Sequence, residues 1–570
     1  MQDKFYIAGQ LREIGRLLKV MGDNPFKIRA YERAARALEN AGDDFDARVK
    51  ERRLTEIDGI GKALAAVVEE TYRTGESAML QQLRGQLPPG VVDLNEVPGL
   101  TLKKIVALHD CLGIKSVDDL KTACEKGLVR GVKGFGPKAE AKLLAAIEKL
   151  DNREDRTLLP HALAEAEQLL QYLRAASEIV QCDIAGSLRR RKETVHRIHL
   201  VASTADSKAV IERFLRYPLF ARSDEADGRR CIGCLARGLE VELHIVAPAD
   251  HASALHYWTG SREHYAAVQN LARSKGIMMS GDGLRGPKGR QLKVETEDDI
   301  YRRLGLKYIA PELRENEGEI EAAAHGSLPD PVLTEDVQGM VHCHTTYSDG
   351  QNTIEEMALA AEAMSMRYVT ITDHSPAAFY AGGVKIDRLR AQWDEIDRVQ
   401  ERVQIRLLKG TESDILEDGL LDYPDYILEK FDIIIASIHA RNKMNADQMT
   451  GRLLRVIELP FFKIWGHPLG RLIPSRPPLE CRMDEVLDAI AASRAAIEIN
   501  GDPHRLDLEP RWIRAARQRG IKFVVSTDAH STSNLQNLPY GVAMARRGWL
   551  SRGEILNTLP VKDFMDVVRP

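Results

Sequence analysis

The 570-residue sequence predicts a multidomain α and α/β protein, with helical domains first, a mixed α/β region next and an α/β barrel last. Residues 1–75 carry apolar side chains at helical spacing and contain few glycines. Residues 337–570 alternate short β-branched runs with amphipathic helical stretches, which is typical of a parallel sheet covered by helices. A chain of this length can bury several separate cores, so we expect roughly three to five domains.

Composition narrows the class of protein. The hydrophobic content of 44% and charged content of 29% are those of an ordinary globular chain, and the net charge is −4. No apolar run is long enough for a membrane span, and the first residues do not resemble a signal peptide. Seven cysteines, an odd number spread thinly, favour a reducing compartment. We therefore expect a monomeric cytoplasmic protein without a membrane partner.

Two glycine turns in the N-terminal region have the spacing of a hairpin between helices. Leu54–Lys62 contains Gly-Ile-Gly-Lys, and Val132–Lys138 contains Gly-Phe-Gly-Pro-Lys; a third unit at Val97–Thr101 lacks the second glycine. Such turns expose the free N–H groups of a helix N-terminus, which can hold a DNA phosphate. The sequence therefore predicts sequence-independent DNA binding through six residues: Gly59, Gly61, Lys62, Gly134, Gly136 and Lys138.

Metal-ligand residue types end one apolar run after another in the last third of the chain. The tract beginning at Val341 reads Val-His-Cys-His, and later runs end in Asp-His, His, His and Asp-Ala-His. In an α/β barrel the carboxyl ends of the strands meet at one face, so these side chains are expected to converge there. The sequence thus predicts a multinuclear metal site, and so an enzyme.

Taken together, the chain resembles the bacterial family X DNA polymerases that carry a C-terminal PHP (polymerase and histidinol phosphatase) domain. The resemblance rests on the two hairpin units, on the metal-ligand series and on three further motifs: Gly-Ser-Leu-Arg-Arg at 186–190, Tyr-Trp-Thr-Gly-Ser at 257–261 and Pro-Glu-Leu-Arg-Glu-Asn at 311–316. It implies six segments: a helical DNA-binding domain with a helix-hairpin-helix at 1–75, a fingers-like domain with a second helix-hairpin-helix at 76–150, a nucleotidyltransferase-like palm at 151–250, a thumb at 251–316, a linker at 317–336, and a PHP metallophosphoesterase domain, a distorted (β/α)7 barrel, at 337–570.

The resemblance also implies the ligand set of the PHP domain. Nine positions match the family's ligands: His342, His344, Asp349, His374, Glu412, His439, His467, Asp528 and His530. On this reading Glu412 bridges two metals. His342, His344 and Asp528 join it on the first, His439 and His467 join it on the second, and Asp349, His374 and His530 hold a third. Imidazole with carboxylate suits Mn²⁺ or Zn²⁺, or else Fe²⁺, and His342, His344, Glu412 and Asp528 are the expected catalytic group. Arg505 and Lys385 are candidate phosphate clamps.

The palm departs from the family. Ser187 and Arg189 keep the family motif, but the strand that should carry an Asp-x-Asp pair has Arg197 and His199 at those positions. Glu242 takes the place of the third aspartate. Two-metal nucleotidyl transfer needs hard anionic oxygen ligands for Mg²⁺, and arginine supplies none. We therefore expect a degenerate polymerase site that does not hold Mg²⁺ and a dNTP.

The sequence is compatible with three functions. The favoured one is a metal-dependent 3′–5′ exonuclease or 3′-end phosphoesterase of DNA repair, including base excision repair, acting on gapped, nicked or 3′-ended DNA. The second is a gap-filling DNA polymerase with unusual ligands drawn from Glu193, Asp206 and Glu242. The third is a DNA-binding scaffold with a silent nuclease.

Overall fold

The computed structural model describes residues 4–569 except 40–44, 58, 76, 88–90, 96, 98–99, 116, 152–155, 236–237, 441–443 and 474. The chain forms two compact units. The first contains residues 1–156 with the short segments 218–223 and 233–240, and the second contains the remainder. No helix among the described residues is long and apolar enough to cross a membrane.

The first unit is built around helices, as its periodicity predicts. Its helices are α1 (Lys4–Met21), α2 (Pro25–Glu39), α3 (Phe45–Lys50), η1 (Leu54–Glu56), α4 (Lys62–Thr74), α5 (Ala78–Gln86), α6 (Val91–Asn95), α7 (Leu102–Leu112), α8 (Val117–Glu125), η2 (Val129–Gly131) and α9 (Pro137–Asp151). Each glycine turn sits just before a helix: Gly59 has φ +89° ahead of α4, and Gly134 has φ +96° ahead of α9. Only glycine adopts this backbone readily, which explains its use at both turns. Part of the third unit, residues 98–99, lies outside the described residues.

The palm region, residues 157–246, is a mixed α/β layer. Its elements are β1 (Thr157–Leu158), α10 (Leu159–Arg174), β2 (Gln181–Ala185), α11 (Gly186–Arg189), β3 (Thr194–Val195), β4 (Arg197–Ser203), α12 (Ser207–Leu215), β5 (Phe220–Asp227), β6 (Arg230–Leu235) and β7 (Glu240–Val246). Five strands form one sheet in the order β2-β4-β7-β6-β5, with β2 and β4 antiparallel. The adjacent strands β4 and β7 carry Arg197, His199 and Glu242, the residues expected from the resemblance to stand in place of aspartates.

The thumb region follows the palm. Its elements are η3 (Pro248–Asp250), α13 (His251–Thr259), α14 (Arg262–Ser274), β8 (Met278–Ser280), β9 (Gly283–Arg285), η4 (Pro287–Gly289), β10 (Gln291–Leu292), α15 (Glu297–Arg303), η5 (Pro311–Leu313) and α16 (Glu319–His325). The last helix falls inside the segment that its acids and its Gly-Ser-Leu-Pro sequence predict as a linker. Glu319 explains the difference, because it is fully buried and lies 2.6 Å from His264 Nδ1. A charged residue buried with a partner fixes a helix that composition alone does not reveal.

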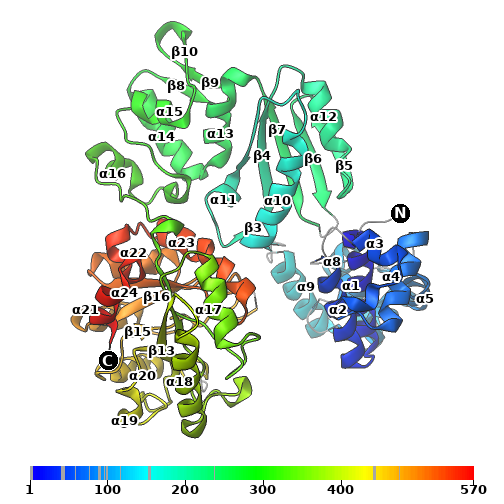
Figure 1. The fold of residues 1–570 in the computed structure, drawn as a ribbon. Coiled ribbons are helices and arrows are strands. Elements are labelled where there is room, and N and C mark those ends of the chain that lie inside the picture. The colour runs from blue at the N-terminus through cyan, green and yellow to red at the C-terminus, as the bar shows by residue number, and fades with distance from the viewer. Residues whose placement is uncertain are drawn as a thin grey trace. The chain divides into compact units, whose positions relative to one another are not determined.

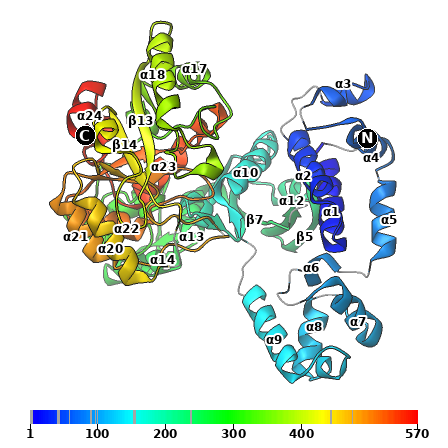
Figure 2. The same ribbon diagram turned by 90° about the horizontal axis from the view of Figure 1, so that it is seen from below.

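The C-terminal region is a nearly closed parallel barrel. Its elements are η6 (Thr334–Asp336), β11 (Gly339–Met340), α17 (Ile354–Ala363), β12 (Tyr368–Ile371), η7 (Phe379–Ala381), α18 (Ile386–Gln400), β13 (Arg406–Asp414), α19 (Asp425–Leu428), β14 (Ile433–Ser437), α20 (Ala446–Ile457), β15 (Ile464–Trp465), α21 (Met483–Ala492), β16 (Ala496–Asn500), α22 (Pro510–Gln518), β17 (Lys522–Ser526), η8 (Thr532–Asn537), α23 (Leu538–Arg547), η9 (Arg552–Glu554), η10 (Leu556–Thr558) and α24 (Val561–Val568). The seven strands pair in chain order, all parallel, and a single parallel bridge between Cys343 and Ala529 joins the two ends. Figures 1 and 2 show the helices outside and the strands inside.

One end of the barrel is filled by the C-terminal helix. Phe564 of α24 is fully buried and stacks on Tyr368, the first residue of β12, with ring centroids 5.1 Å apart. Phe564 and Val568 belong to the same buried cluster as Leu408 and Ile433, which lie in the barrel strands. Since this end is packed with apolar side chains, the polar residues of the barrel gather at the opposite, carboxyl end of the strands.

Candidate metal centre

The carboxyl ends of the barrel strands bring all nine predicted ligand residues to one site. Each of six strands contributes, and the positions are His342, His344 and Asp349 after β11, His374 after β12, Glu412 within β13, His439 after β14, His467 after β15, and Asp528 and His530 after β17. The residues come from sequence positions almost 190 apart and meet because successive parallel strands end at the same face.

Glu412 lies at the centre of this site. It is 1% exposed, and its Oε1 lies 2.8 Å from His467 Nε2 and 3.3 Å from His439 Nε2. Its Oε2 lies 2.8 Å from His374 Nδ1 and 3.5 Å from His342 Nε2. One carboxylate is thus surrounded by imidazoles on both oxygens, the position that the sequence assigns to a bridging ligand.

A second carboxylate, Asp528, lies on the other side of the paired histidines. Its Oδ1 is 3.2 Å from His344 Nε2 and 3.5 Å from His342 Nε2. His344 presents its other ring nitrogen, Nδ1, to Asp349 at 4.0 Å. His344 therefore stands between two groups of donors, whereas the sequence assigns it to one metal alone.

A third group forms around Asp349, the most exposed of the nine. Its Oδ1 lies 3.4 Å from His530 Nε2 and 3.6 Å from His374 Nε2. With His344 these residues make a four-donor group whose ligand atoms all lie within 4.8 Å of one another. Two further groups of this kind centre on Glu412, one with His342 and His344 and one with His374 and His439.

The donor atoms of the site fit divalent cations. His342 Nε2, His344 Nδ1, His374 Nδ1 and Glu412 Oε2 are buried, and none makes a well-oriented hydrogen bond among the described residues, although His374 Nδ1 and Glu412 Oε2 lie 2.8 Å apart. Buried polar atoms nearly always have hydrogen-bond partners, so several unpaired donor atoms in one place indicate a binding site for a cation. Imidazole nitrogen with carboxylate oxygen is the donor set of Mn²⁺, Zn²⁺ and Fe²⁺ sites.

The carboxylates control the protonation of the histidines. Burial opposes the charged form of His342, but Glu498, Asp528 and Glu412 raise its pKa well above the usual range. Against the same effect of burial, Glu412 and Asp414 raise the pKa of His439 to about 10. A site of this kind binds protons tightly in the absence of cations, so protons and metal ions compete for it.

His344 and His530 behave in opposite ways. Burial, together with the neighbouring His374 and His530, lowers the pKa of His344 to about 3. Burial also disfavours the charged form of His530, but the hydrogen bond to Asp349 raises its pKa to about 9. His344 is therefore the neutral imidazole of the pair and is ready to act as a ligand at neutral pH.

Glu498 is a functional candidate that the sequence reasoning missed. It lies in β16, is fully buried, and its Oε1 is 2.6 Å from His342 Nδ1. The Oε2 atom accepts a hydrogen bond from the His467 backbone N–H. A carboxylate on the far nitrogen of a ligand histidine fixes the ring orientation. The detectable signal was an acid in the middle of an otherwise apolar strand, Ala-Ile-Glu-Ile-Asn.

Asp373 was also missed as a supporting residue. It is 2% exposed and accepts hydrogen bonds from Thr345 N at 2.7 Å, Ser348 Oγ at 2.5 Å and Gln392 Nε2 at 2.6 Å. Burial raises the pKa of its carboxyl. Asp373 fastens the loop after β11, which carries His344 and Asp349, to the end of β12.

The two candidate phosphate clamps have different environments. Arg505 lies with its Nε 3.2 Å from Asp528 Oδ2, and its Nε and Nη1 are buried without a hydrogen-bond partner among the described residues. Lys385 is exposed at the start of α18. Only Arg505 therefore reaches the cluster, and its unsatisfied N–H groups are suited to an anion.

The palm residues singled out in the sequence lie together on the face of the sheet or beside it. Arg197 Nη1 donates to Glu242 Oε2 at 2.7 Å, and His199 Nδ1 lies 3.2 Å from His244 Nε2. Ser187 is half-buried in α11. Arg189 turns away to the thumb, where its Nη2 lies 2.5 Å from Glu297 Oε2. Burial, with nearby charge, lowers the pKa of His244 to about 3.

The alternative carboxylate set for a polymerase site does not come together. Asp206 caps helix α12 by accepting from Ala209 N at 3.1 Å. Glu193 accepts from Arg547 Nη1 at 2.6 Å and lies 3.6 Å from Arg471 Nη2, both in the barrel region. Glu242 lies apart from both and is paired with Arg197, whose Nη1 is 2.7 Å from Glu242 Oε2.

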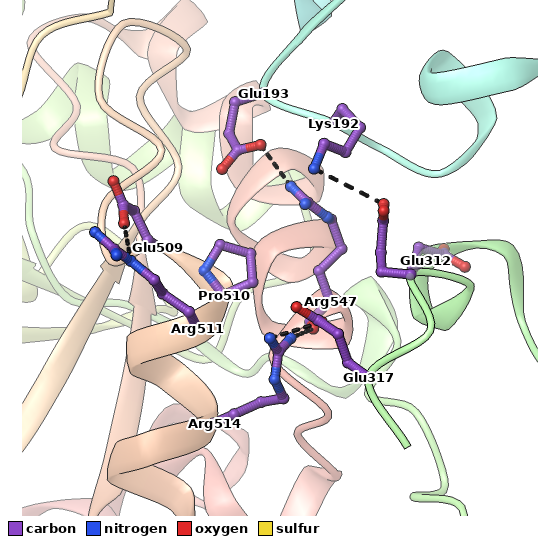
Figure 3. Close-up of a pocket in the computed structure, with 10 residues that line it drawn as sticks. Lys192, Glu193, Glu312, Glu317, Glu509, Pro510, Arg511, Arg514 and Arg547 are labelled. Atoms are coloured by element: carbon purple, nitrogen blue, oxygen red, sulfur yellow. Dashed lines mark hydrogen bonds and ion pairs between the residues drawn. The ribbon is translucent and has the colours of Figure 1, made fainter. Parts of the chain in front are cut away.

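Glu193 belongs to a charged cavity between the palm, the thumb and the barrel. The cavity has a volume of about 230 Å³, and its lining pairs Arg547 with Glu193 and Arg514 with Glu317 at 2.6 Å each. Figure 3 shows these pairs around Pro510. The acidic and basic side chains of the lining neutralise one another, and the metal-ligand residues lie elsewhere. The ion pairs of this cavity therefore hold the palm, thumb and barrel regions of the second unit together.

The six hairpin residues lie where a DNA backbone can approach them. Gly59, Gly61 and Lys62 are exposed, as are Gly134 and Lys138, while Gly136 is half-buried. Lys62 is the first residue of α4, and Gly136 directly precedes α9. The N-termini of two helices therefore lie open at the surface of the first unit.

Comparisons with known proteins agree with this organisation. The helix-hairpin-helix domain family matches residues 3–77, and the SAM-like helix-hairpin-helix tandem family matches residues 91–149. The DNA polymerase beta thumb family matches residues 254–315, and the PHP domain family matches residues 341–501. A probable phosphatase of Thermoanaerobacter sp. (strain X514) is 27% identical over 38% of this chain and 89% of its own length.

Two relatives extend the likeness to the polymerase-like regions. DNA polymerase lambda of Rattus norvegicus is 24% identical over 54% of this chain and 56% of its own length. The DNA polymerase/3′-5′ exonuclease PolX of Bacillus subtilis (strain 168) is 34% identical over 97% of both chains. The combination of hairpin domains, thumb, PHP barrel and end-to-end similarity leads to one conclusion: the chain belongs to the bacterial family X DNA polymerases that carry a C-terminal PHP domain.

Proposed function

We propose that the PHP barrel of this protein is a metal-dependent 3′–5′ exonuclease, or a related 3′-end phosphoesterase, that acts on DNA in repair. The observation that carries the proposal is the convergence on Glu412 of four imidazoles, two of which, His342 Nε2 and His374 Nδ1, are buried and make no hydrogen bond among the described residues. The name of the Bacillus subtilis relative, which includes a 3′-5′ exonuclease, and the probable phosphatases similar to the barrel both support it.

Each residue has a definable role in phosphodiester hydrolysis. Glu412 would be shared by two cations, one held also by His342, His344 and Asp528 and the other by His439 and His467. Asp349, His374 and His530 make the third group. Bound cations at such a site supply an activated water at neutral pH and offset the negative charge of the phosphodiester. Mn²⁺ and Zn²⁺ fit these donors best, with Fe²⁺ next.

The other residues orient this machinery. Glu498 holds the His342 ring with Nε2 facing Glu412, because its carboxylate accepts a hydrogen bond from Nδ1–H. Arg505 presents unsatisfied N–H groups beside Asp528, where a nonbridging phosphate oxygen would gain a charge-assisted hydrogen bond. No protein nucleophile is required in this scheme.

We further propose that the palm has lost nucleotidyl transfer and helps to position DNA. The guanidinium of Arg197 occupies the place of a metal-ligating carboxylate and already pairs with Glu242. Mg²⁺ binding is disfavoured for two reasons: two anionic ligands are missing, and a positive charge has been added. The exposed hairpin turns of the first unit supply the contacts to the DNA backbone.

A second function, gap-filling synthesis, is kept because the name of the Bacillus subtilis relative also includes DNA polymerase. A single assay separates the two. A gapped duplex with a 5′-labelled primer strand is incubated with Mn²⁺, with and without the four dNTPs. We expect shortening of the strand in both cases, lost in His344→Ala and retained in His325→Ala, whose exposed histidine lies outside the cluster. Retained shortening in His344→Ala would refute the proposed nuclease.

A further inference from the structure

A second cluster of metal-ligand residues lies in the palm, far in sequence from the barrel histidines. Arg197 and His199 are two residues apart on β4, and Glu242 and His244 are two residues apart on the adjacent strand β7. Alternate residues of a strand point to the same face of the sheet. The four side chains therefore share one face, and two of them are imidazoles.

The donor atoms of three of these residues have the spacing of a metal site. His199 Nδ1 lies 3.2 Å from His244 Nε2 and 4.0 Å from Glu242 Oε2, and His244 Nε2 lies 3.9 Å from Glu242 Oε1. Zn–N bonds of roughly 2.0–2.1 Å in a tetrahedron place neighbouring donors about 3.3 Å apart. A small inward shift of the Glu242 carboxylate would bring all three within bonding distance of one ion.

The surrounding residues hold the two rings in place. Trp258 of α13 stacks on His244 with centroids 3.5 Å apart and planes at 10°, and it lies 5.8 Å from the His199 ring. Gly186 packs against His199: a Cβ at Gly186 would come within 2.9 Å of His199 Cδ2, so a larger residue would displace the ring. His244 is 4% exposed and Glu242 is 3% exposed. Rings restrained in this way lose little entropy on binding an ion.

We propose that His199, His244 and Glu242 form a binding site for one transition-metal dication of the Zn²⁺ class. Two imidazoles and one carboxylate suit Zn²⁺, whereas Mg²⁺ prefers all-oxygen octahedral coordination. Three protein donors leave the fourth tetrahedral position to water. This site is separate from the proposed nuclease centre and does not depend on it. The palm would then bind Zn²⁺ through histidines where the family binds Mg²⁺ through carboxylates.

Two arginines limit the affinity of this site. Arg197 Nη1 lies 2.7 Å from Glu242 Oε2, and Arg230 Nη1 lies 3.4 Å from Glu242 Oε1. An ionised carboxylate has about four acceptor positions, so both arginines can remain while one lone pair is donated to a metal. Their charges nevertheless repel a dication at this distance. Arg197→Ala is therefore expected to tighten Zn²⁺ binding, by about tenfold or more.

The test is metal content at equilibrium. Chelator-stripped full-length protein is dialysed against buffered Zn²⁺ in excess Mg²⁺, and bound zinc is measured by elemental analysis. The wild type is expected to hold one zinc per chain more than His199→Ala or His244→Ala. Zinc bound in the barrel is common to all three proteins and cancels in the difference. His196→Ala, which removes the exposed histidine that precedes Arg197, is the matched control and should equal the wild type.

Two further variants keep the test informative if a histidine variant does not fold. Glu242→Gln preserves the shape of the side chain and should weaken zinc binding at this site at least tenfold, while Arg197→Ala should strengthen it. Equal zinc content in the wild type and both folded histidine variants would overturn the proposal. An unchanged zinc affinity in Glu242→Gln would overturn it equally.

Discussion

The imidazole of His342 lies with Nδ1 2.6 Å from the Glu498 carboxylate, which turns Nε2 toward Glu412 and Asp528 at 3.5 Å each. Both residues are fully buried. Glu498 also accepts from Ser526 Oγ at 2.5 Å and from the backbone of His467. One carboxylate outside the expected ligand set therefore positions two of the ligands.

The first prediction concerns this carboxylate. Glu498→Gln should lower metal affinity or exonuclease activity about 10–100-fold, because the neutral amide orients His342 less firmly and no longer supports its charge. Bound manganese and the rate of 3′-end shortening are the measurements. Glu401→Gln, at an exposed position, should leave both unchanged. Normal manganese content and rate in Glu498→Gln would show that Glu498 is only a packing residue.

The second prediction is that metal binding releases protons at pH 7. Without metal, the nearby carboxylates raise the pKa of His342 well above its usual range, that of His439 to about 10 and that of His530 to about 9. These imidazoles must deprotonate to bind metal, and each belongs to a different proposed site, so roughly one proton should leave per site filled and about three when all three sites fill. Affinity should therefore rise between pH 6 and 8. Calorimetry in buffers of different ionisation enthalpy counts the protons, and a count of zero would contradict the assigned ligands.

The third prediction separates the two candidate phosphate clamps. Arg505→Ala should lower kcat/KM about 10²-fold with unchanged metal content, because it removes a donor to the developing negative charge. Arg505→Lys should recover little, since an ammonium lacks the planar fork of a guanidinium. Lys385→Ala, at an exposed position, should change kcat/KM no more than about threefold. Equal effects of Arg505→Ala and Lys385→Ala would reject the special position of Arg505.

The fourth prediction concerns acid stability at the junction of palm and barrel. Burial alone would raise the pKa of Glu193, but Arg547 and Arg471 lower it from 4.5 to about 2. A depressed carboxyl pKa stabilises the fold above the unfolded value near 4.5, and that contribution is lost as the pH falls through about 2. Glu193→Gln should therefore cost about 3 kcal/mol at pH 7 and roughly half of that at pH 3.

Urea unfolding at several pH values measures this contribution. Glu335→Gln, which changes an exposed acid in the same unit, is the control and should unfold like the wild type at every pH. A difference between wild type and Glu193→Gln that does not shrink on acidification would mean that the ion pairs with Arg547 and Arg471 contribute little to stability.

The sequence predicted the barrel, and the convergence of metal-ligand residue types at one end of it, because both follow from local patterns. A β-branched run ending in histidine marks the end of a strand, and parallel strands end together, so His439 and His467 could be placed without knowing any contact. Glu498 could not, because an acid inside a strand is recognised as functional only when the ring that it faces is known. Helix α16 was missed for a similar reason, since the partner of Glu319 is His264, which is 55 residues away.

The palm shows a second kind of feature that the sequence alone does not predict. The resemblance to the family places Arg197, His199 and Glu242 where aspartates are expected, and it predicts only which ligands are lost. The proposed zinc site depends also on His244, which belongs to no motif, and on the stacking of Trp258 against it. Spacing of two residues on neighbouring strands becomes a candidate site only once the strand order β4-β7 is known.

The most direct test of the central claim is the fate of one labelled strand. A gapped duplex with a 5′-labelled primer, Mn²⁺ and all four dNTPs reports on both active sites at once. We predict that the full-length protein only shortens the strand, and that His344→Ala abolishes this change. Lengthening of the strand by the wild type, lost in Glu242→Gln, would contradict the claim that the barrel is the working centre and that the palm no longer synthesises DNA.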